Sequence, residues 1–334
     1  MVDILAAGNV YDERIHNNGS SERRVGGSPA NFAMAARSLD LDAALVGRVG
    51  KDERARFIGG FLEDHGLSFH PVYDDTRTEL AVHRVYPNGG STIRKRLRHE
   101  KGANQNLSHH DLDSAVSALQ PALVYLSGVD KNRMRADWKG LKTTLKRVDH
   151  KMIDLNRQPA NPAETAGFFK YVSPEFDFLF FSDSEIKFWH DIHVKHNGAQ
   201  ELTVYPSDPL MKEHKDTLCY ATTMLAAGPR NVVVHMEDRG LLCVSANDHR
   251  RHVTYALPHK IKNVNPVGAG DASNVGFAYG LLHGADTVES LRMANALGAL
   301  HAAGKEPRSM AELERFMKHD RRPVIQDSMR VLTR

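Results

Sequence analysis

The sequence is poor in cysteine and has no long apolar run. Its two cysteines, Cys219 and Cys243, lie far apart without metal-site spacing, so no disulfide framework is expected and an intracellular protein is indicated. No stretch approaches the about 18 apolar residues that a membrane-spanning helix needs. Residues 1–8 lack the basic and apolar segments of a secretion signal. We therefore expect a cytoplasmic protein that does not contact a membrane.

An excess of one charge and the commoner phosphate-binding loops are also missing. The formal net charge of +3 at pH 7 is too small to indicate nucleic acid as a partner. No lysine follows Gly276 as a Walker A loop requires, and Ser273 stands where a dinucleotide-binding loop has its third glycine. No repeat, low-complexity segment or linker divides the chain, so we expect one domain spanning residues 1–334.

The most informative stretch runs from Val264 to Gly276, with the sequence VNPVGAGDASNVG. Its proline and glycines predict a tight loop, and the apolar residues 275–282 predict a helix after it. Free N–H groups at the start of that helix form an anion site, and its positive end favours the ionised form of Asp271. A carboxylate there can take a proton from a hydroxyl while the amides hold charge on a phosphoryl group. The alternative is a strand-to-helix turn capped by an aspartate.

Strand-like and helix-like segments alternate along the chain, which predicts a doubly wound, mostly parallel α/β sheet flanked by helices on both faces. Strands are expected at residues 4–10, 43–50, 123–128, 151–154, 178–181, 231–236 and 241–245, and helices at 51–63, 107–119 and 138–148. Ligands of such sheets bind beyond the carboxyl ends of the strands. Asp12 follows the first strand and is therefore a candidate site residue, or else a turn aspartate.

A glycine pair, Gly26 and Gly27, precedes a helix with a proline near its start. Asn31 lies in the first turn of this helix, near whatever group the glycines approach. The polar residues 13–25 before the pair show no helical period, and we expect them to form an exposed excursion.

A β-hairpin is predicted at residues 79–98, where two alternating segments flank Pro87-Asn-Gly-Gly90. Few of its apolar side chains share a face, so it is expected to lie over another part of the molecule. We interpret it as part of a small inserted β-lid formed by about residues 11–27 and 76–104. Its basic strand, with Arg96 and Arg98, is either a solvated edge strand or a contact for an anionic group of the substrate.

Polar residues follow the strand at 178–181. Asp183 and Glu185 could hold Mg²⁺ through water, and the alternative is that Ser182 and Asp183 cap a helix. Three histidines of this helix, at positions 190, 193 and 196, lie on one side, and we expect a solvated helix face rather than a metal site.

Taken together, these features resemble the ribokinase-like (PfkB) carbohydrate kinases over nearly the whole length. The resemblance rests on Gly26-Gly27-Ser-Pro-Ala-Asn31, on Val46-Gly-Arg-Val-Gly-Lys-Asp52 and on Asn265-Pro-Val-Gly-Ala-Gly-Asp271, in that order. It implies a ribokinase-like fold and ATP-dependent phosphorylation of a sugar hydroxyl, with Mg²⁺ and a possible monovalent cation. It also implies a homodimer formed through the lid.

The resemblance assigns roles to individual residues. Asp271 matches the catalytic base, with an anion hole formed by Gly268, Ala269 and Gly270. Asp12, Gly27 and Asn31 match contacts to the sugar hydroxyls, and Gly26 is expected beside them. Arg157 lies one place before the arginine of a similar element in fructokinase and ketodeoxygluconate kinase types. The basic strand adds Arg96 and Arg98 as residues expected to face the substrate. The residues expected to bind the nucleotide are Ser182, His235, Glu237, Gly240, Gly268, Gly270 and Asn295. Glu185 and Asp183 are expected at the metal.

Three positions depart from the family pattern. Ser182 replaces a usual asparagine, Glu237 a common glycine, and Asn265 an aspartate that in some members helps to hold a monovalent cation. We expect a kinase of a ketose or sugar acid, similar to fructokinases and ketodeoxygluconate kinases. Two alternatives stay open: a nucleoside kinase on the same fold, which would want more aromatic residues near the lid than Tyr73 and Tyr86, and a catalytically weak sugar- or nucleotide-binding protein.

Overall fold

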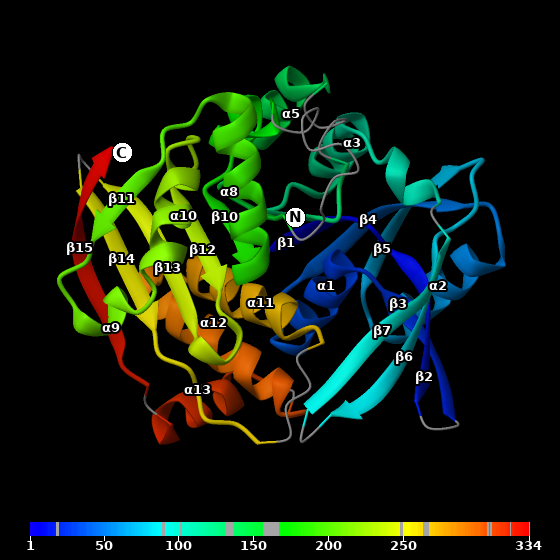
Figure 1. The fold of residues 1–334 in the computed structure, drawn as a ribbon. Coiled ribbons are helices and arrows are strands. Elements are labelled where there is room, and N and C mark those ends of the chain that lie inside the picture. The colour runs from blue at the N-terminus through cyan, green and yellow to red at the C-terminus, as the bar shows by residue number, and fades with distance from the viewer. Residues whose placement is uncertain are drawn as a thin grey trace.

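A large twisted sheet forms the centre of the computed structural model (Figure 1), which describes residues 1–334 except 18–19, 89–90, 101, 131–135, 156–166, 248–249, 263–266, 306, 308, 321 and 334. Its eleven strands follow the order β11-β15-β14-β13-β12-β10-β9-β8-β1-β4-β5. Their bounds are β1 Ile4–Gly8, β4 Ala43–Gly50, β5 Ser68–Asp74, β8 Leu123–Ser127, β9 His150–Asp154, β10 Phe178–Ser182, β11 Leu202–Tyr205, β12 Asn231–His235, β13 Leu241–Asn247, β14 Arg250–Ala256 and β15 Val324–Thr333.

The strands from β12 to β5 in this order run parallel to their neighbours, whereas β13, β14, β15 and β11 add to the sheet in antiparallel fashion. Every residue of β1 and β8 is buried, as expected for parallel strands that are covered on both faces. The predicted doubly wound, mostly parallel sheet is therefore confirmed.

Helices cover both faces of the sheet, as two separate apolar cores show. One core contains α3 His109–Leu119, α5 Trp138–Leu145, α7 Gly167–Tyr171, α8 Asp183–Asn197, α9 Pro209–Lys212 and α10 Lys215–Leu225. The other contains α1 Ser28–Ser38, α2 Glu53–Asp64, α11 Ala269–Leu282, α12 Thr287–Ala302 and α13 Met310–His319. Short 3₁₀ turns, η1 Ala103–Asn106, η2 Ser173–Glu175 and η3 Glu237–Arg239, complete the described elements.

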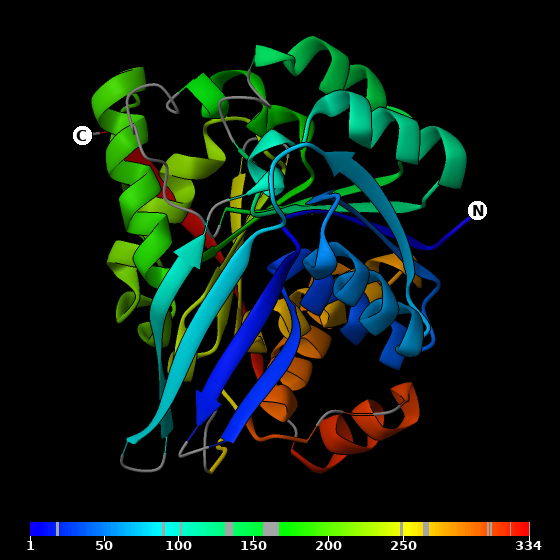
Figure 2. The same ribbon diagram turned by 90° about the vertical axis from the view of Figure 1, so that its right-hand side faces the viewer.

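A second sheet of four strands stands beside the main body, blue and cyan in Figures 1 and 2. Its order is β3-β2-β6-β7, with bounds β2 Tyr11–Asn17, β3 Ser20–Gly26, β6 Leu80–Asn88 and β7 Ser91–Glu100. The expected hairpin is thus present as β6 and β7. The expectation of an exposed excursion at residues 13–25 holds only in part: residues 20–22 are exposed, but the segment forms β2 and β3, and β2 pairs with both β3 and β6. Glu13 is only 1% exposed there and forms ion pairs with Arg24 and His83.

The helices in the described part of the chain include none that is long and apolar enough to cross a membrane. Both cysteines are free, with Cys243 buried in the core and Cys219 partly buried. Burial raises the pKa of the Cys243 thiol to about 12, so it remains an uncharged apolar filler at neutral pH.

Candidate active site

Two helix N-termini meet at the carboxyl edge of the parallel strands. Helix α11 begins after Gly268, which has φ 83°, and helix α1 begins after Gly27, which has φ 118°. Both angles are in the region that favours glycine. A Cβ at Gly27 would lie 2.1 Å from the Asn9 carbonyl oxygen, so this turn also needs a residue without a side chain. The helices that follow the two glycines contact each other through hydrogen bonds from Ser28 and Asn31 to Asp271, so the two segments lie side by side.

Asp271 lies in the first turn of α11, and its carboxylate joins the two motifs. Oδ1 accepts a short hydrogen bond from Ser28 Oγ, and Oδ2 accepts one from Asn31 Nδ2 at 2.9 Å. Each oxygen keeps a second lone pair that can accept a proton from a hydroxyl group. The structure thus brings the predicted base next to Asn31, a residue that the sequence places 240 positions away.

The pKa of Asp271 corrects one expectation from the sequence. The helix terminus alone predicts a stabilised carboxylate, but burial raises the pKa of Asp271 above its usual value. Hydrogen bonds from Ser28 and Asn31, together with the charge of His301, act in the opposite direction without cancelling this effect. A raised pKa makes a carboxylate a stronger base, which suits proton abstraction.

The first turn of α11 borders open space. Among the described residues, no atom would lie within 4 Å of a Cβ at Gly270, so space is open in front of the first turn. His301 lies behind the loop, with Nε2 2.9 Å from the Val267 carbonyl oxygen. A cavity of about 590 Å³ adjoins the same loop and is lined by Asn31, Gly268, His301 and Arg24, among others. Asp271 is not among its lining residues, so this cavity lies beside the carboxylate rather than over it.

Asp12 occupies an unexpected environment. It is completely buried, and its two oxygens accept hydrogen bonds from Arg23 Nε at 3.0 Å and Arg23 Nη2 at 2.9 Å. The guanidinium also stacks on Phe57, 4.0 Å from the ring centroid. A contact between Asp12 and a sugar hydroxyl stays a prediction, and it would require this ion pair to open.

Ser182, Asp183 and Glu185 form the start of α8. Ser182 caps the helix, and Glu185 Oε2 accepts hydrogen bonds from Ser182 N at 2.8 Å and Ser182 Oγ at 2.7 Å. Asp183 accepts bonds from Thr217 Oγ1 at 2.7 Å and Arg239 Nη2 at 2.6 Å through its two oxygens. The geometry favours a structural role for Asp183 over the metal role expected from the sequence. Glu185 keeps one oxygen outside the cap, which fits a water-mediated hold on Mg²⁺.

Besides Ser182, two of the residues predicted to bind the nucleotide make side-chain hydrogen bonds within the described part of the chain. His235 Nε2 lies 2.9 Å from Asn274 Oδ1, and Asn295 Nδ2 donates to the Leu257 carbonyl oxygen at 2.7 Å. Gly240 has φ 92° and packs on the Ala256 carbonyl, where a Cβ would lie at 2.2 Å. Glu237 lies in η3 with φ 56°, a conformation that favours the glycine common in related proteins. Their contact with a nucleotide stays a prediction.

The side chains of three predicted substrate residues lie outside the described part of the chain. Arg157 lies outside the described residues. The backbone of β7 pairs Arg96 with His83 and Arg98 with Val82, across a register shift between Val82 and His83. The side chains of Arg96 and Arg98 lie outside what the structure describes.

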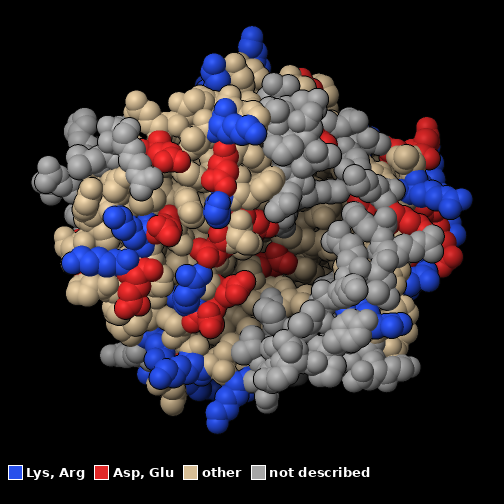
Figure 3. All heavy atoms as spheres, viewed as in Figure 1, with Lys and Arg blue, Asp and Glu red and all other residues tan. Residues whose placement is uncertain are grey.

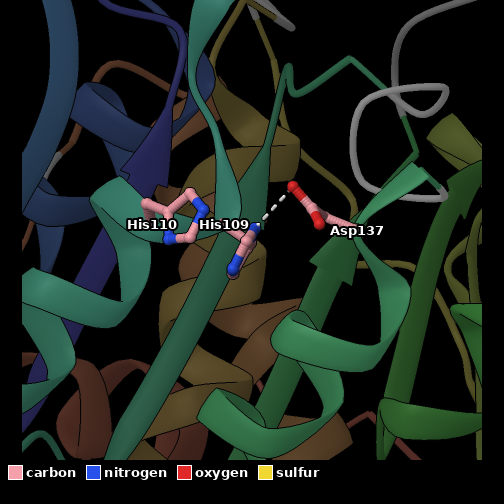
Figure 4. Close-up of side chains that lie close together, drawn as sticks. All are labelled: His109, His110 and Asp137. Carbon is pink, nitrogen blue, oxygen red and sulfur yellow. Dashed lines mark ion pairs between the residues drawn. The ribbon is translucent and has the colours of Figure 1, made fainter.

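A group of possible metal ligands, His109, His110 and Asp137, lies between α3 and α5 (Figure 4). His109 Nδ1 is 2.9 Å from Asp137 Oδ2, so these two form an ion pair between the helices whenever the histidine is protonated. Both helices present their N-terminal ends here, and the partial positive charge of these ends disfavours a cation. We therefore assign the group a structural role.

The solvated helix face expected for the histidines of α8 is wrong for two of them. His190 and His193 are 5% and 8% exposed, and they pack on Tyr220 and Phe169. Burial lowers the pKa of His193, so it stays neutral at neutral pH. These side chains fill the core between α8 and its neighbours.

The face of the molecule in Figure 3 is hollowed near its centre, and acidic side chains gather on the rim of the hollow.

A family model for pfkB family carbohydrate kinases matches residues 2–312, which include both glycine motifs and the Asp271 turn. The chain belongs to the pfkB family of carbohydrate kinases. It is therefore a phosphotransferase that acts on a sugar hydroxyl, and use of ATP follows from the family.

Individual relatives agree with this family at low identity. A 5-dehydro-2-deoxygluconokinase of Bacillus thuringiensis is 23% identical over 309 residues, with 88% of this chain and 86% of the relative covered. Escherichia coli phosphofructokinase-2 in complex with potassium superposes with a TM-score of 0.71 at 16% identity, covering 96% of this chain and 99% of that one. A Vibrio cholerae fructokinase with bound fructose, ADP and potassium gives 0.68 at 21% identity, covering 95% and 98%. The two structures confirm the fold.

The sequence left four polar residues of this region without a role: Arg23, Ser28, Tyr125 and Asn274. Ser28 is part of a glycine motif, which was a usable signal for it. Tyr125 stands in a buried strand and Asn274 in an apolar helix, where a single polar residue indicates a buried hydrogen bond but not its partner. Only the fold reveals that Arg23 pairs with Asp12, and that Tyr125 and Asn274 are connected to Asp271 through Ser28.

Proposed function

We propose that this carbohydrate kinase transfers the γ-phosphoryl group of ATP to a hydroxyl of a ketose or sugar acid. The observation that carries the proposal is the carboxylate of Asp271, placed in the first turn of α11 near Gly270, beside which the described part of the chain leaves open space. A buried carboxylate of raised pKa next to free helix amides combines a base with an anion site.

The residues divide the work of phosphoryl transfer between them. Asp271 accepts the proton of the attacking hydroxyl, while Ser28 and Asn31 hold its carboxylate in place. The N–H groups of Gly268, Ala269 and Gly270 face the transferred group and hold its charge. Positioning and charge stabilisation are the main requirements of this reaction, because little covalent chemistry falls to the protein.

Metal ions would assist at two places. Mg²⁺ neutralises charge on the phosphates when bound, and Glu185 would hold it through water with the oxygen that the helix cap does not use. A monovalent cation is suggested by the Escherichia coli neighbour, whose structure is a complex with potassium. Replacing potassium chloride by choline chloride in the assay would lower turnover if this cation is needed.

A sugar acid is the substrate class that two observations support. The relative from Bacillus thuringiensis is named for a sugar acid, and the expected lid contributes a basic strand with Arg96 and Arg98. We propose that the four-stranded sheet closes over this substrate as a lid and excludes water, which protects ATP from hydrolysis.

We also propose that two protomers associate through this lid. Strands β3 and β7 are the edges of the four-stranded sheet, and each leaves a row of backbone groups for pairing. Light scattering would give about twice the chain mass of 37.2 kDa for a dimer. A measured mass equal to that of a single chain would exclude the dimer.

The experiment that tests the function is ADP release with ATP and Mg²⁺ against a panel of acceptors. The panel contains fructose, ribose, ketodeoxygluconate, fructose phosphates and nucleosides. One strong signal among the ketoses or sugar acids would support the proposal. A strong signal with nucleosides alone would replace it by a nucleoside kinase. Thermal stabilisation by a sugar without ADP release would favour a binding protein.

A further inference from the structure

A continuous chain of buried hydrogen bonds runs behind the catalytic carboxylate. Tyr125, on β8, lies 3.0 Å from Ser28 through its hydroxyl, and Asn274 Nδ2, on α11, donates to the same hydroxyl at 3.2 Å. Asn274 Oδ1 in turn meets His235 Nε2 at 2.9 Å, at the end of β12. The chain therefore connects three other elements, α1, β8 and β12, to Asp271 and its helix α11.

The protons of this chain can be placed from the number of donors. Ser28 has one hydroxyl proton and gives it to Asp271, so the bond between Tyr125 and Ser28 must use the proton of Tyr125. The Tyr125 hydroxyl can also donate to Asp154 Oδ2, but this contact is longer, at 3.5 Å, so the shorter bond to Ser28 is the favoured use of its proton.

The remaining protons follow from the amide of Asn274. Its Nδ2 group donates to Tyr125 and, at 2.9 Å, to Asp154, so its Oδ1 must accept from the Nε2–H of His235. One donor of each residue from His235 to Ser28 thus points along the chain toward the carboxylate of Asp271, and the second N–H of Asn274 branches off to Asp154. Hydrogen bonds aligned in one direction polarise one another, which strengthens the last bond to the charged acceptor.

The surroundings keep this arrangement rigid. The ring of Tyr125 stacks on Phe32, with centroids 3.9 Å apart and an interplanar angle of 10°. Burial, together with the charges of Asp154 and Asp271, raises the pKa of Tyr125 well above its usual value, so the hydroxyl stays protonated as a donor. Burial lowers the pKa of His235, which keeps that ring neutral at neutral pH.

We propose that Tyr125 and Asn274 are positioning residues for the carboxylate of Asp271. They act through Ser28, and they hold the carboxylate in one orientation for the attacking hydroxyl. The proposal rests on the proposed kinase function only for its first test. The second test needs no turnover.

The first test is the pH dependence of turnover for Tyr125→Phe and Ser28→Ala. Loss of a hydrogen bond to the ionised carboxylate raises the pKa of Asp271, so the acid limb of kcat moves to higher pH. We expect the acid limb to shift by about one pH unit for Ser28→Ala, which removes a direct hydrogen bond to Asp271. For Tyr125→Phe we expect a shift of about half a pH unit. KM for the sugar should change less than twofold, because the substrate contacts remain.

Tyr279→Phe is the matched control. Tyr279 lies on the same helix as Asp271, and its ring stacks on His283 at 3.9 Å, away from this chain of bonds. Its pH profile should superpose on that of the wild type. A Tyr125→Phe profile that also superposes on the wild type would overturn the proposal.

The second test measures the free energy of unfolding between pH 4 and pH 8. A carboxylate whose folded pKa is raised makes the fold less stable as the pH rises through that pKa. The decrease in the free energy of unfolding that Tyr125→Phe causes should therefore become larger as the pH rises. This pH dependence should disappear when the substitution is made in the Asp271→Asn variant. A cost that is independent of pH, and equal in both backgrounds, would show a packing role only and would overturn the proposal. If no acceptor is phosphorylated, this measurement still decides the matter.

Discussion

At the scale of single residues, buried ion pairs stabilise the base of the four-stranded sheet. Asp12 has no exposed surface, and Arg23 satisfies both its oxygens while retaining 32% exposure of its own side chain. An arginine fork that meets both carboxylate oxygens holds its partner more firmly than a single charge would. The sequence could place Asp12 at a strand end, but it gave no signal that residue 23 would pair with it.

Arg23→Ala should therefore destabilise the fold. A charged hydrogen-bonded partner is lost and the buried carboxylate is left without it, so we expect a decrease of about 2–3 kcal/mol in the free energy of unfolding. Arg23→Lys keeps the positive charge but cannot bond to both carboxylate oxygens in the way that arginine does. Its free energy of unfolding should therefore lie between those of the wild type and Arg23→Ala. Urea unfolding measures the effect, with the exposed Arg56→Ala as control. Equal stabilities of Arg23→Ala and Arg56→Ala would show that the pair contributes nothing.

The basic strand β7 gives a second prediction at this scale. Arg96→Ala and Arg98→Ala should each raise KM for an anionic sugar about tenfold, because a charged contact is lost, and leave KM for a neutral sugar nearly unchanged. Steady-state kinetics with a sugar acid and a ketose provides the comparison, and Arg315→Ala on α13 is the control. Equal changes for both sugars would assign these arginines to a solvated edge strand.

At the scale of elements, helix ends decide the geometry of the site. Gly27 and Gly268 adopt positive φ before α1 and α11, and Ser182 caps α8. Glycine, proline and capping residues are local signals, so these ends could be predicted from the sequence. The turn at residues 238–240 could be predicted in the same way, but the conformation of Glu237 could not, because it adopts φ 56° although it is not glycine. The surrounding strands β12 and β13 impose that conformation on it.

Glu237→Gly should stabilise the protein. A side chain in the left-handed region costs about 1–2 kcal/mol, and glycine relieves it at some cost in unfolded-chain entropy, so we expect a net gain of about 0.5–1 kcal/mol. Asp238→Gly is the matched control: it is exposed in the same turn but lacks the positive φ, and should lose stability. Thermal unfolding of the two variants should show shifts of opposite sign. A lower stability of Glu237→Gly than of the wild type would contradict the claim that the backbone is strained at this position.

At the scale of the whole molecule, the alternation of strands and helices was sufficient to predict the layered α/β fold. The parallel strands are buried apolar runs, and each helix buries one side, which are properties of local sequence. The contacts of the site were harder to predict. Ser28 and Asp271 are 243 positions apart, and Tyr125 and Asn274 are 149 apart. Such pairs follow from the order of the strands, which local patterns do not encode.

The central claim is that Asp271 is the base of a sugar kinase. The most direct test compares Asp271→Asn with the wild type on the acceptor found in the panel, and measures sugar binding by calorimetry in parallel. An amide keeps the shape of the carboxylate but cannot take the proton, so kcat should fall about a thousandfold while the sugar Kd changes little. Turnover at the wild-type rate would contradict the assignment of the base and, with it, the proposed mechanism.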